Sequence, residues 1–206
     1  MIWAVVLAAG ESRRMGTQKL LLPFGDATVV EAVVKAALAS RVDRAMVVLG
    51  ADAREVRAKL APAGADFTVN EDHGRGMLSS VQAGFAALGE GAEAAVVMLG
   101  DQPFLPSAVV DAVIAAYRAS GKGIVIPTFQ GRRGHPVLVD MKYRAEVLGL
   151  DPSDGLRQLM RAHPEDIHEA DVADANVLRD LDTPEDYQER VKMGSNLPFT
   201  RKTGKR

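Results

Sequence analysis

The 206-residue chain contains no cysteine. Disulfide bonds and thiolate metal ligands are therefore excluded, and the composition is consistent with a reducing compartment. No apolar run reaches the length that spans a membrane, and residues 1–3 lead straight into a predicted strand without a basic segment or a cleavage site. We therefore expect a cytoplasmic protein with no membrane partner.

The sequence also lacks an excess of charge of one sign. It has 25 Lys and Arg against 27 Asp and Glu, for a net charge of −2. This balance offers no general electrostatic attraction for nucleic acid or an anionic membrane, so any anion must be bound by local basic residues. Because 47% of the residues are hydrophobic, the chain can bury a sizeable core in one globular domain.

Two common phosphate-binding motifs are missing as well. Residues 10–19 lack the Gly-Lys-Ser/Thr ending of a P-loop, and there is no Gly-x-Gly-x-x-Gly. In their place an apolar run at residues 2–7 is followed by three small residues and three cations: Ala8, Ala9, Gly10, Arg13, Arg14 and Lys19. Small residues let a backbone approach a flat or anionic ligand. The stretch therefore predicts a polyphosphate site.

Apolar runs alternate with helical patterns along most of the chain. We expect strands at residues 2–7, 45–49, 67–70, 94–99, 123–127, 136–139 and 167–170. We expect helices at residues 32–38, after a capping box at 28–31, and at 52–61, 77–88, 106–119 and 183–192, with two short helices before the last strand. This order predicts a Rossmann-like α/β fold with three layers (α/β/α) and a mostly parallel sheet. The strand at 136–139 is predicted to lie at an edge.

Ligands of such sheets bind at the carboxyl ends of the strands. This rule places the loops that follow Leu7, Asn70 and Leu99 along one edge. Residues after 193 are rich in Gly, Ser, Lys and Arg and have no periodicity. We therefore expect a domain at residues 1–193 and a flexible basic tail at 194–206.

Four segments resemble known enzymes. The pattern Leu-Ala-Ala-Gly-x-Ser-x-Arg-Met-Gly-x-x-Lys at residues 7–19 resembles the signature of nucleotidyltransferases that join an NTP to a phosphorylated partner and release pyrophosphate. Gly-Asp-Gln-Pro at 100–103, Gly-His-Pro-Val at 134–137 and Asp-Leu-Asp-Thr-Pro-Glu-Asp at 180–186 resemble one branch, the molybdenum cofactor cytidylyltransferases. The resemblance implies the fold of nucleotide-diphospho-sugar transferases, with CTP and a pterin phosphate (molybdopterin) as substrates.

Both reactants of nucleotidyl transfer are anions, so cations and positioning should dominate catalysis. Arg14 and Lys19 suit a triphosphate, and the resemblance makes Lys19 the catalytic lysine, whereas Arg13 falls at a variable position and is expected at the surface. Asp101 directly follows an apolar strand. A carboxylate aimed at a triphosphate is repulsive unless a divalent cation lies between them, which favours Mg²⁺ as cofactor.

The second metal ligand is predicted to be Asp182 or Asp180. The resemblance places a metal or phosphate ligand in this stretch but leaves open which of the two carboxylates contacts the metal. The alternative is that residues 182–184 only begin a helix.

The nucleotide site is predicted to combine the first loop with the start of the helix at 77–88. By resemblance, Ser80 and the backbone of residues 8–10 contact cytosine, and Gln102 helps to select the pyrimidine, whereas helix capping is the alternative role for Ser79 or Ser80. The predicted nucleotide-binding residues are Leu7, Ala8, Ala9, Gly10, Arg14, Lys19, Asn70, Ser79, Ser80, Gly84 and Gln102.

His135 is predicted to bind the acceptor, because the resemblance places Gly-His-Pro near the pterin phosphate; an ordinary turn histidine is the alternative.

The sequence as a whole suggests three functions. The first is Mg²⁺-dependent transfer of CMP from CTP to molybdopterin, with a molybdoenzyme or its chaperone as receiving partner. The second is guanylyl or other nucleotidyl transfer to a sugar or polyol phosphate. The third is a non-catalytic chaperone that delivers the cofactor and docks through the basic tail.

Overall fold

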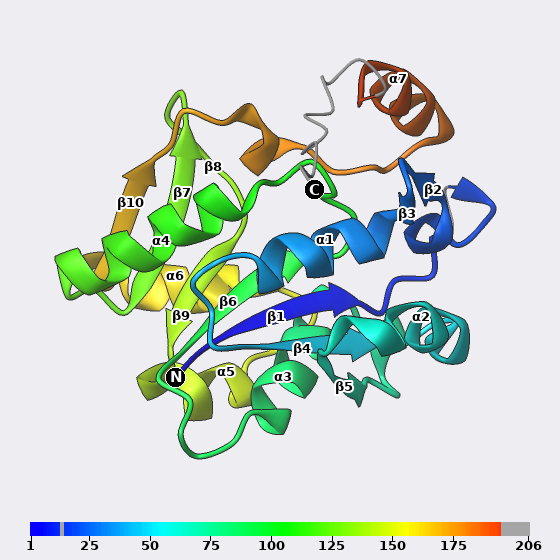
Figure 1. The fold of residues 1–206 in the computed structure, drawn as a ribbon. Helices are drawn as coiled ribbons and strands as arrows, with labels where there is room; N and C mark the ends of the chain where they lie inside the picture. Colours follow the sequence, from blue (N-terminus) through cyan, green and yellow to red (C-terminus); the bar gives the residue numbers. More distant parts are fainter. Residues whose placement is uncertain (13–14, 195–206) are drawn as a thin grey trace, which may run out of the picture.

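The computed structural model describes residues 1–12 and 15–194. These residues form a fold built around one central sheet of parallel and antiparallel strands (Figure 1). The strands follow the order β10-β7-β9-β6-β1-β4-β5, with β8 paired to β7, and a separate hairpin joins β2 to β3. Their bounds are β1 Ile2–Ala8, β2 Pro23–Phe24, β3 Ala27–Thr28, β4 Arg44–Leu49, β5 Asp66–Val69, β6 Ala94–Leu99, β7 Ile124–Phe129, β8 Arg132–Arg133, β9 Val137–Asp140 and β10 Ile167–Asp171.

Helices cover both faces of the sheet. The α-helices are α1 Val29–Leu38, α2 Ala53–Leu60, α3 Met77–Ala87, α4 Ser107–Ser120, α5 Arg144–Gly149, α6 Arg157–Ala162 and α7 Pro184–Gly194. Short 3-10 turns are η2 Lys19–Leu21, η3 Ala61–Ala63, η4 His73–Arg75, η5 Met141–Tyr143, η6 Pro164–Asp166 and η7 Ala175–Leu178. The predicted three-layer α/β/α arrangement is confirmed.

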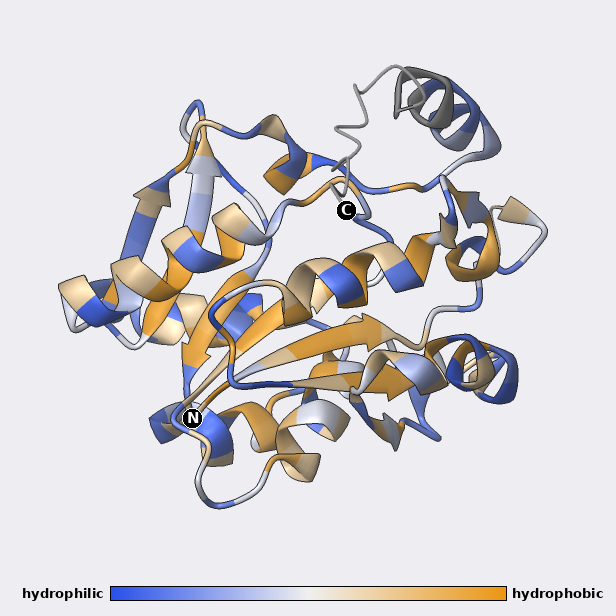
Figure 2. Cartoon of the chain, in the orientation of Figure 1, coloured by the Kyte–Doolittle hydropathy of each residue, from blue (hydrophilic) through white to orange (hydrophobic). Residues whose placement is uncertain are grey.

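The apolar strands are buried because each face packs against helices. On β1, Ala4 and Val6 join the core under α1, α2 and α4, whereas Trp3 and Val5 join the core over α3, α5 and α6. Figure 2 shows the same pattern as hydrophobic strands between helices that carry their polar residues outward. The continuous apolar run that opens the chain is thus typical of a strand covered on both sides.

The expected position of one strand was wrong. Strand β9, predicted at an edge, lies inside the sheet and pairs antiparallel with both β6 and β7. Its residues Val137, Leu138 and Val139 are all buried. After the turn at residues 130–134, the chain runs back between β6 and β7. The glycines in that turn predict a reversal of direction, but they do not indicate which strands β9 pairs with.

Capping residues define two helix starts as predicted. The Glu31 carboxylate accepts hydrogen bonds from the backbone N–H and the hydroxyl of Thr28, both at 2.7 Å, at the start of α1. At the start of α7, Asp186 Oδ2 accepts from the Thr183 N–H at 3.0 Å. These bonds satisfy donors that a helix leaves unpaired. Helix α7 ends at Gly194, and the rest of the predicted basic tail lies outside the described residues.

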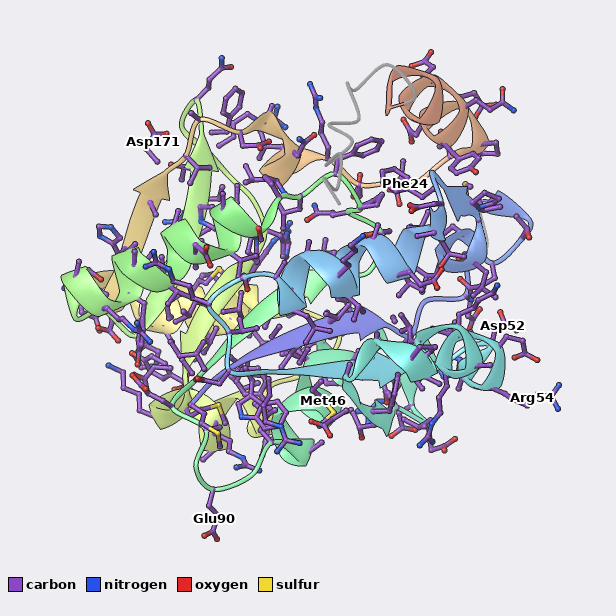
Figure 3. All side chains as sticks on the ribbon, in the orientation of Figure 1. Phe24, Met46, Asp52, Arg54, Glu90 and Asp171 are labelled. Carbon is purple, nitrogen blue, oxygen red and sulfur yellow. The ribbon has the colours of Figure 1, made fainter. Side chains whose placement is uncertain are left out.

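Charged side chains lie on the outside of the molecule. In Figure 3, Arg54, Glu90 and Asp171 project away from the ribbon. Within residues 1–12 and 15–194, no helix is both long enough and apolar enough to cross a membrane.

Candidate active site

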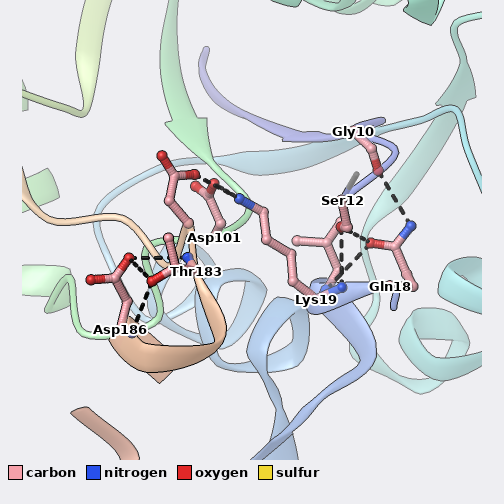
Figure 4. Close-up of polar contacts among 9 residues, drawn as sticks. Gly10, Ser12, Gln18, Lys19, Asp101, Thr183 and Asp186 are labelled. Carbon is pink, nitrogen blue, oxygen red and sulfur yellow. Dashed lines mark hydrogen bonds and ion pairs between the residues drawn. The ribbon is translucent and has the colours of Figure 1, made fainter. Parts of the chain in front are cut away.

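The first loop, after β1, is braced by Gln18 and Ser12 (Figure 4). Gln18 Oε1 accepts from Ser12 Oγ at 2.8 Å, and Gln18 Nε2 donates to Gly10 O at 3.3 Å and to Asp52 Oδ2 at 2.9 Å. Ser12 Oγ also accepts from the Lys19 N–H at 3.1 Å. The loop is thereby folded back on itself, and Lys19 is held at its end.

Lys19 joins two carboxylates that come from distant parts of the sequence. Its Nζ lies 2.5 Å from Asp101 Oδ2 and 3.2 Å from Asp182 Oδ1. Asp101 follows β6, and its carbonyl accepts from the Leu181 N–H at 3.1 Å, which fixes the segment that carries Asp180 and Asp182. Three of the predicted site residues, Lys19, Asp101 and Asp182, are therefore in direct contact.

Gly100 allows this approach of β6 to the first loop. Its N–H donates to Leu7 O at 3.0 Å, and a Cβ at this position would lie 2.6 Å from that same oxygen. A larger residue would push the two strand ends apart, so a glycine before Asp101 is required by close backbone packing.

The electrostatics of this cluster favour a cation. Burial acts to lower the pKa of the Lys19 ammonium, but the charges and hydrogen bonds of Asp101 and Asp182 outweigh it and raise the pKa above 10.5. Burial, followed by the charges of Asp182 and Asp101, raises the pKa of the Asp180 carboxyl above 3.8. Asp101, Asp180 and Asp182 therefore lie around Lys19, and the negative charge of these carboxylates repels an anionic ligand unless positive charge offsets it.

A cavity of about 510 Å³ opens over this cluster at the carboxyl edge of the sheet. Eight of the predicted site residues line it, namely Leu7, Ala9, Gly10, Lys19, Ser80, Asp101, Asp180 and Asp182. The walls also include His73, Gly76 and Met77, which belong to the segment expected near the site, and Glu11, Met15 and Gly74, which were not among the predicted ligands. The strand-end rule thus located the cavity but not its full lining.

Asn70, Ser79 and Ser80 form a buried group beside this cavity. Asn70 Nδ2 donates to Ser79 Oγ at 2.8 Å and to Ser80 Oγ at 3.0 Å. Ser79 Oγ in turn donates to the carbonyls of Gly76, at 2.7 Å, and Asp72, at 3.1 Å. Asn70 and Ser79 therefore shape the loop, whereas Ser80 lines the cavity and its hydroxyl donates to no other group among the described residues.

Three other predicted nucleotide-binding residues, Ala8, Gly84 and Gln102, do not line the cavity. Ala8 is fully buried in β1. Gly84 packs α3 against the sheet, since a Cβ there would lie 2.5 Å from Val5 Cγ1. Gln102 is 4% exposed, and its Oε1 is buried with no hydrogen-bond partner among residues 1–12 and 15–194. Arg14 lies outside the described residues, as does Arg13.

A second cavity, of about 700 Å³, adjoins the first and contains His135. Leu7, Gly76 and Met77 line both cavities. The peptide bond between His135 and Pro136 is cis. Burial lowers the pKa of the His135 imidazole, and the charge of Asp180 opposes that shift without cancelling it. His135 is thus a half-buried residue that lines a cavity next to the Lys19 cluster, and its surroundings favour the neutral imidazole.

The carboxylates suit a hard divalent cation such as Mg²⁺, which prefers oxygen ligands and often takes only one or two carboxylates together with substrate phosphates. Asp101 and Asp182 converge on one point, where Lys19 Nζ now lies between their oxygens. Within the part of the chain that the structure describes, no group of three or more His, Asp or Glu side chains is arranged to hold a metal without further ligands. The residues therefore fit a metal that substrate helps to bind.

Comparisons with known proteins agree with this geometry. Residues 4–167 match the family model described as the MobA-like NTP transferase domain. The molybdenum cofactor cytidylyltransferase of Escherichia coli (strain K12) is 28% identical over 187 residues, covering 89% of this chain and 92% of that protein. The nicotine blue oxidoreductase of Paenarthrobacter nicotinovorans is 34% identical over 194 residues, covering 89% of this chain and 93% of that protein.

Solved structures give the same result. A homologue of Mycobacterium tuberculosis Rv0371c from Mycobacterium sp. strain JC1 is 34% identical with a TM-score of 0.84, over 94% of this chain and 96% of that one. Rv0371c itself, in a complex with manganese, is 30% identical with a TM-score of 0.78, over 93% and 98% of the two chains. The chain therefore belongs to the family of MobA-like NTP transferases, and it is an enzyme of the nucleotidyltransferase class.

Proposed function

We propose that the enzyme transfers CMP from CTP to the phosphate of a molybdopterin-type cofactor and releases pyrophosphate. The observation that carries the proposal is the convergence of Lys19, Asp101 and Asp182 in a cavity that adjoins a second one. Two adjoining cavities suit a reaction that brings together two ligands. The 28% identical relative that is named a molybdenum cofactor cytidylyltransferase supports this choice of substrates.

The bonds exchanged in this reaction set what the protein must do. An acceptor phosphate oxygen attacks the α-phosphorus of CTP, and the bond from that phosphorus to the oxygen bridging the β-phosphorus breaks. Pyrophosphate leaves with the electron pair. Because both reactants are anions, the protein must reduce their mutual repulsion and hold them in line.

Lys19 is proposed to neutralise the triphosphate as catalytic lysine, with Arg14 sharing this role by its place in the motif. The half-buried position of Lys19 strengthens its attraction for phosphate, because water screens it only partly. The N–H groups of the loop that Gln18 and Ser12 brace add fixed dipoles toward the same anion.

Asp101 and Asp182, with Asp180 nearby, are proposed to hold Mg²⁺. When bound, the cation would neutralise charge on the transferred phosphate and the leaving pyrophosphate. A manganese complex of a 30% identical structure supports a divalent cation, and Mg²⁺ is proposed because carboxylate oxygens and substrate phosphates are its usual ligands.

Cytosine is proposed to bind between the first loop and the start of α3. Ser80 keeps a hydroxyl proton for a base edge, and Ala9 and Gly10 of the first loop line the same cavity. Asn70, Ser79, Gly84 and Gln102 would act from behind this wall by holding α3 and the loops in place. The acceptor is proposed to bind in the second cavity against His135.

The test is pyrophosphate release from purified protein with CTP, GTP, ATP or UTP, each with Mg²⁺ and molybdopterin. We expect release with CTP that depends on both molybdopterin and the metal. Preference for GTP would replace the cytidylyl proposal by guanylyl transfer. Release with a sugar or polyol phosphate but not with molybdopterin would replace the acceptor. Binding of CTP and cofactor without any pyrophosphate would favour a delivery chaperone.

A further inference from the structure

The turn η4 lies between the two cavities. His73 and Gly74 line the first cavity, Arg75 lines the second, and the two residues that follow Arg75 line both. Gly76 and Met77, with Leu7, form what we call the shared wall of the two cavities. Of the arginines that line the second cavity, Arg75 is the one that directly precedes these shared residues in the sequence. The sequence pattern around it gave no reason to single it out.

The backbone of this turn is held firmly. Asn70 Oδ1 accepts from the Asp72 N–H at 3.0 Å, and Asp72 O accepts from the Arg75 N–H at 2.9 Å. His73 Nδ1 lies 3.2 Å from Asn70 O. The buried Asn70 and its serine partners thus fix the point from which the Arg75 side chain extends.

The second cavity combines apolar side chains with arginines. Its apolar lining comes from Leu78, Val81, Val97, Ile126, Val137, Leu156 and Met160, and its cations are Arg75, Arg133, Arg157 and Arg161. An apolar lining with cations around it is complementary to a ligand that has a flat, weakly polar body and an anionic group.

Two of these arginines already have close carboxylate partners. Arg133 Nη2 lies 2.7 Å from Glu169 Oε1, and Arg161 is paired with Asp154. Among the described residues, Arg75 forms a loose ion pair, in which its Nη1 lies 3.8 Å from Asp72 Oδ2 and the two side chains are 62% and 71% exposed, and its charge also acts on Asp151. Such an exposed pair contributes little, so a ligand phosphate can replace it at low cost.

We propose that Arg75 binds the phosphate group of the acceptor where the two cavities meet, while the apolar lining holds the acceptor's ring system. This inference rests on the proposed function, because transfer requires the acceptor phosphate to reach the nucleotide in the first cavity. The planar guanidinium can donate two parallel hydrogen bonds to a phosphate. Arg157 lines the same cavity but is not adjacent in sequence to the residues that line both cavities, so it serves as the competing candidate.

The proposal is tested by binding, without any catalytic turnover. Protein saturated with CMP is titrated with naphthyl phosphate, and separately with naphthol, which has the ring but no phosphate. The variants are Arg75→Gln, Arg157→Gln and Arg54→Gln; Arg54 is 92% exposed on α2 and lines neither cavity. Thermal melting of each variant verifies that the fold is retained.

We expect Arg75→Gln to weaken naphthyl phosphate binding at least about tenfold, in the range of a lost hydrogen bond to a charged group, and to leave naphthol binding within about twofold. Arg54→Gln should behave as the unaltered protein. Wild-type affinity in Arg75→Gln, a larger loss in Arg157→Gln, or no preference for the phosphate form in the unaltered protein would each overturn the proposal.

A kinetic test separates this inference from the proposed function. In the pyrophosphate assay, Arg75→Gln should raise the KM for the acceptor and leave the KM for CTP unchanged. If the unaltered protein releases no pyrophosphate but Arg75→Gln still loses naphthyl phosphate, the proposed reaction fails while the phosphate site stands. If the unaltered protein releases pyrophosphate but Arg75→Gln keeps the same KM for the acceptor, the proposed reaction stands and the phosphate site at Arg75 fails.

Discussion

At the scale of single residues, Lys19 shows how one ammonium serves two sets of anions. In this structure it lies against Asp101 and Asp182, with its side chain only 15% exposed. In the proposed complex it would contact the triphosphate instead, and the carboxylates would hold the metal. The proposed function thus requires lysine, metal and phosphate to meet at this point, which would explain why the three side chains converge there.

Replacement of Asp101 by Asn tests its role as metal ligand. We expect turnover to fall about a hundredfold or more, since loss of several kcal/mol of charge stabilisation corresponds to at least that factor. The fold should persist because Asp101 lies in the loop after β6, outside the buried core. Initial rates of pyrophosphate release measure the effect. Asp171→Asn, at an exposed position on β10, is the matched control, and an unchanged rate in Asp101→Asn would refute the metal assignment.

Replacement of Gln18 by Ala tests whether a braced loop is needed. The variant loses the hydrogen bonds of Gln18 to Ser12, Gly10 and Asp52, each contributing about 1 kcal/mol. We expect the KM for the nucleotide to rise about tenfold or more while the KM for the acceptor stays the same. Steady-state rates with each substrate varied give both values. Gln188→Ala, exposed on α7, should change neither, and an equal rise in both KM values would argue against a role confined to the first loop.

At the scale of elements, the start of helix α3 forms part of the wall of the first cavity. Its first turn presents Ser80 to the cavity, and Gly84 one turn later lets the helix rest directly on β1 and β4. A Cβ on Gly84 would lie 2.5 Å from Val5 Cγ1 and 3.1 Å from Val48 Cγ2. The glycine therefore positions the serine through helix packing and not through contact with a ligand.

We expect Gly84→Ala to destabilise the protein by about 1 to 2 kcal/mol. The overpacking costs about 1 to 3 kcal/mol, and the better helix propensity of alanine offsets up to about 1 kcal/mol of it. Urea unfolding followed by circular dichroism measures the change. Gly89→Ala is the control, because a Cβ there meets nothing within 4 Å. A Gly84→Ala variant as stable as the unaltered protein would mean that α3 can shift freely.

At the scale of the whole molecule, the end of the sheet opposite the cavities is tied together by Asp166. Its Oδ2 accepts from the Tyr143 hydroxyl at 2.6 Å and from the Gly123 N–H at 3.0 Å, and it lies 2.8 Å from Lys142 Nζ. Burial acts to raise the pKa of the Asp166 carboxyl, but these partners outweigh it and lower the pKa from 3.8 to about 2.

This shift predicts a dependence of stability on pH. Because the pKa of Asp166 is lower in the folded state, its stabilising effect is complete above the unfolded value of 3.8 and is lost as the pH falls toward about 2. At pH 6, Asp166→Asn should therefore have a lower free energy of unfolding than the unaltered protein. At pH 3, the difference in free energy of unfolding between the two proteins should be smaller. Urea midpoints at both pH values give the comparison. A constant difference would show that the carboxylate charge is not what matters.

Much of the fold and of the candidate site could be predicted from local pattern. Three signals that extend over a few residues each predicted the correct element. They are the apolar run before Gly10, the capping box at Thr28 and the apolar run that precedes Asp101. The rule that ligands lie at the carboxyl ends of parallel strands predicts that Lys19 and Asp101 are neighbours. The structure shows the two side chains in contact.

The sequence by itself thus determined the alternation of strands and helices, the family motifs and the chemical groups available for phosphate and metal. Tertiary structure alone decided that β9 lies inside the sheet, that Gly84 serves packing, and that Arg75 stands beside the wall shared by two cavities. The reason is that hydrophobic period and capping act over a few residues, whereas strand order and cavity walls depend on which distant segments exclude water from one another.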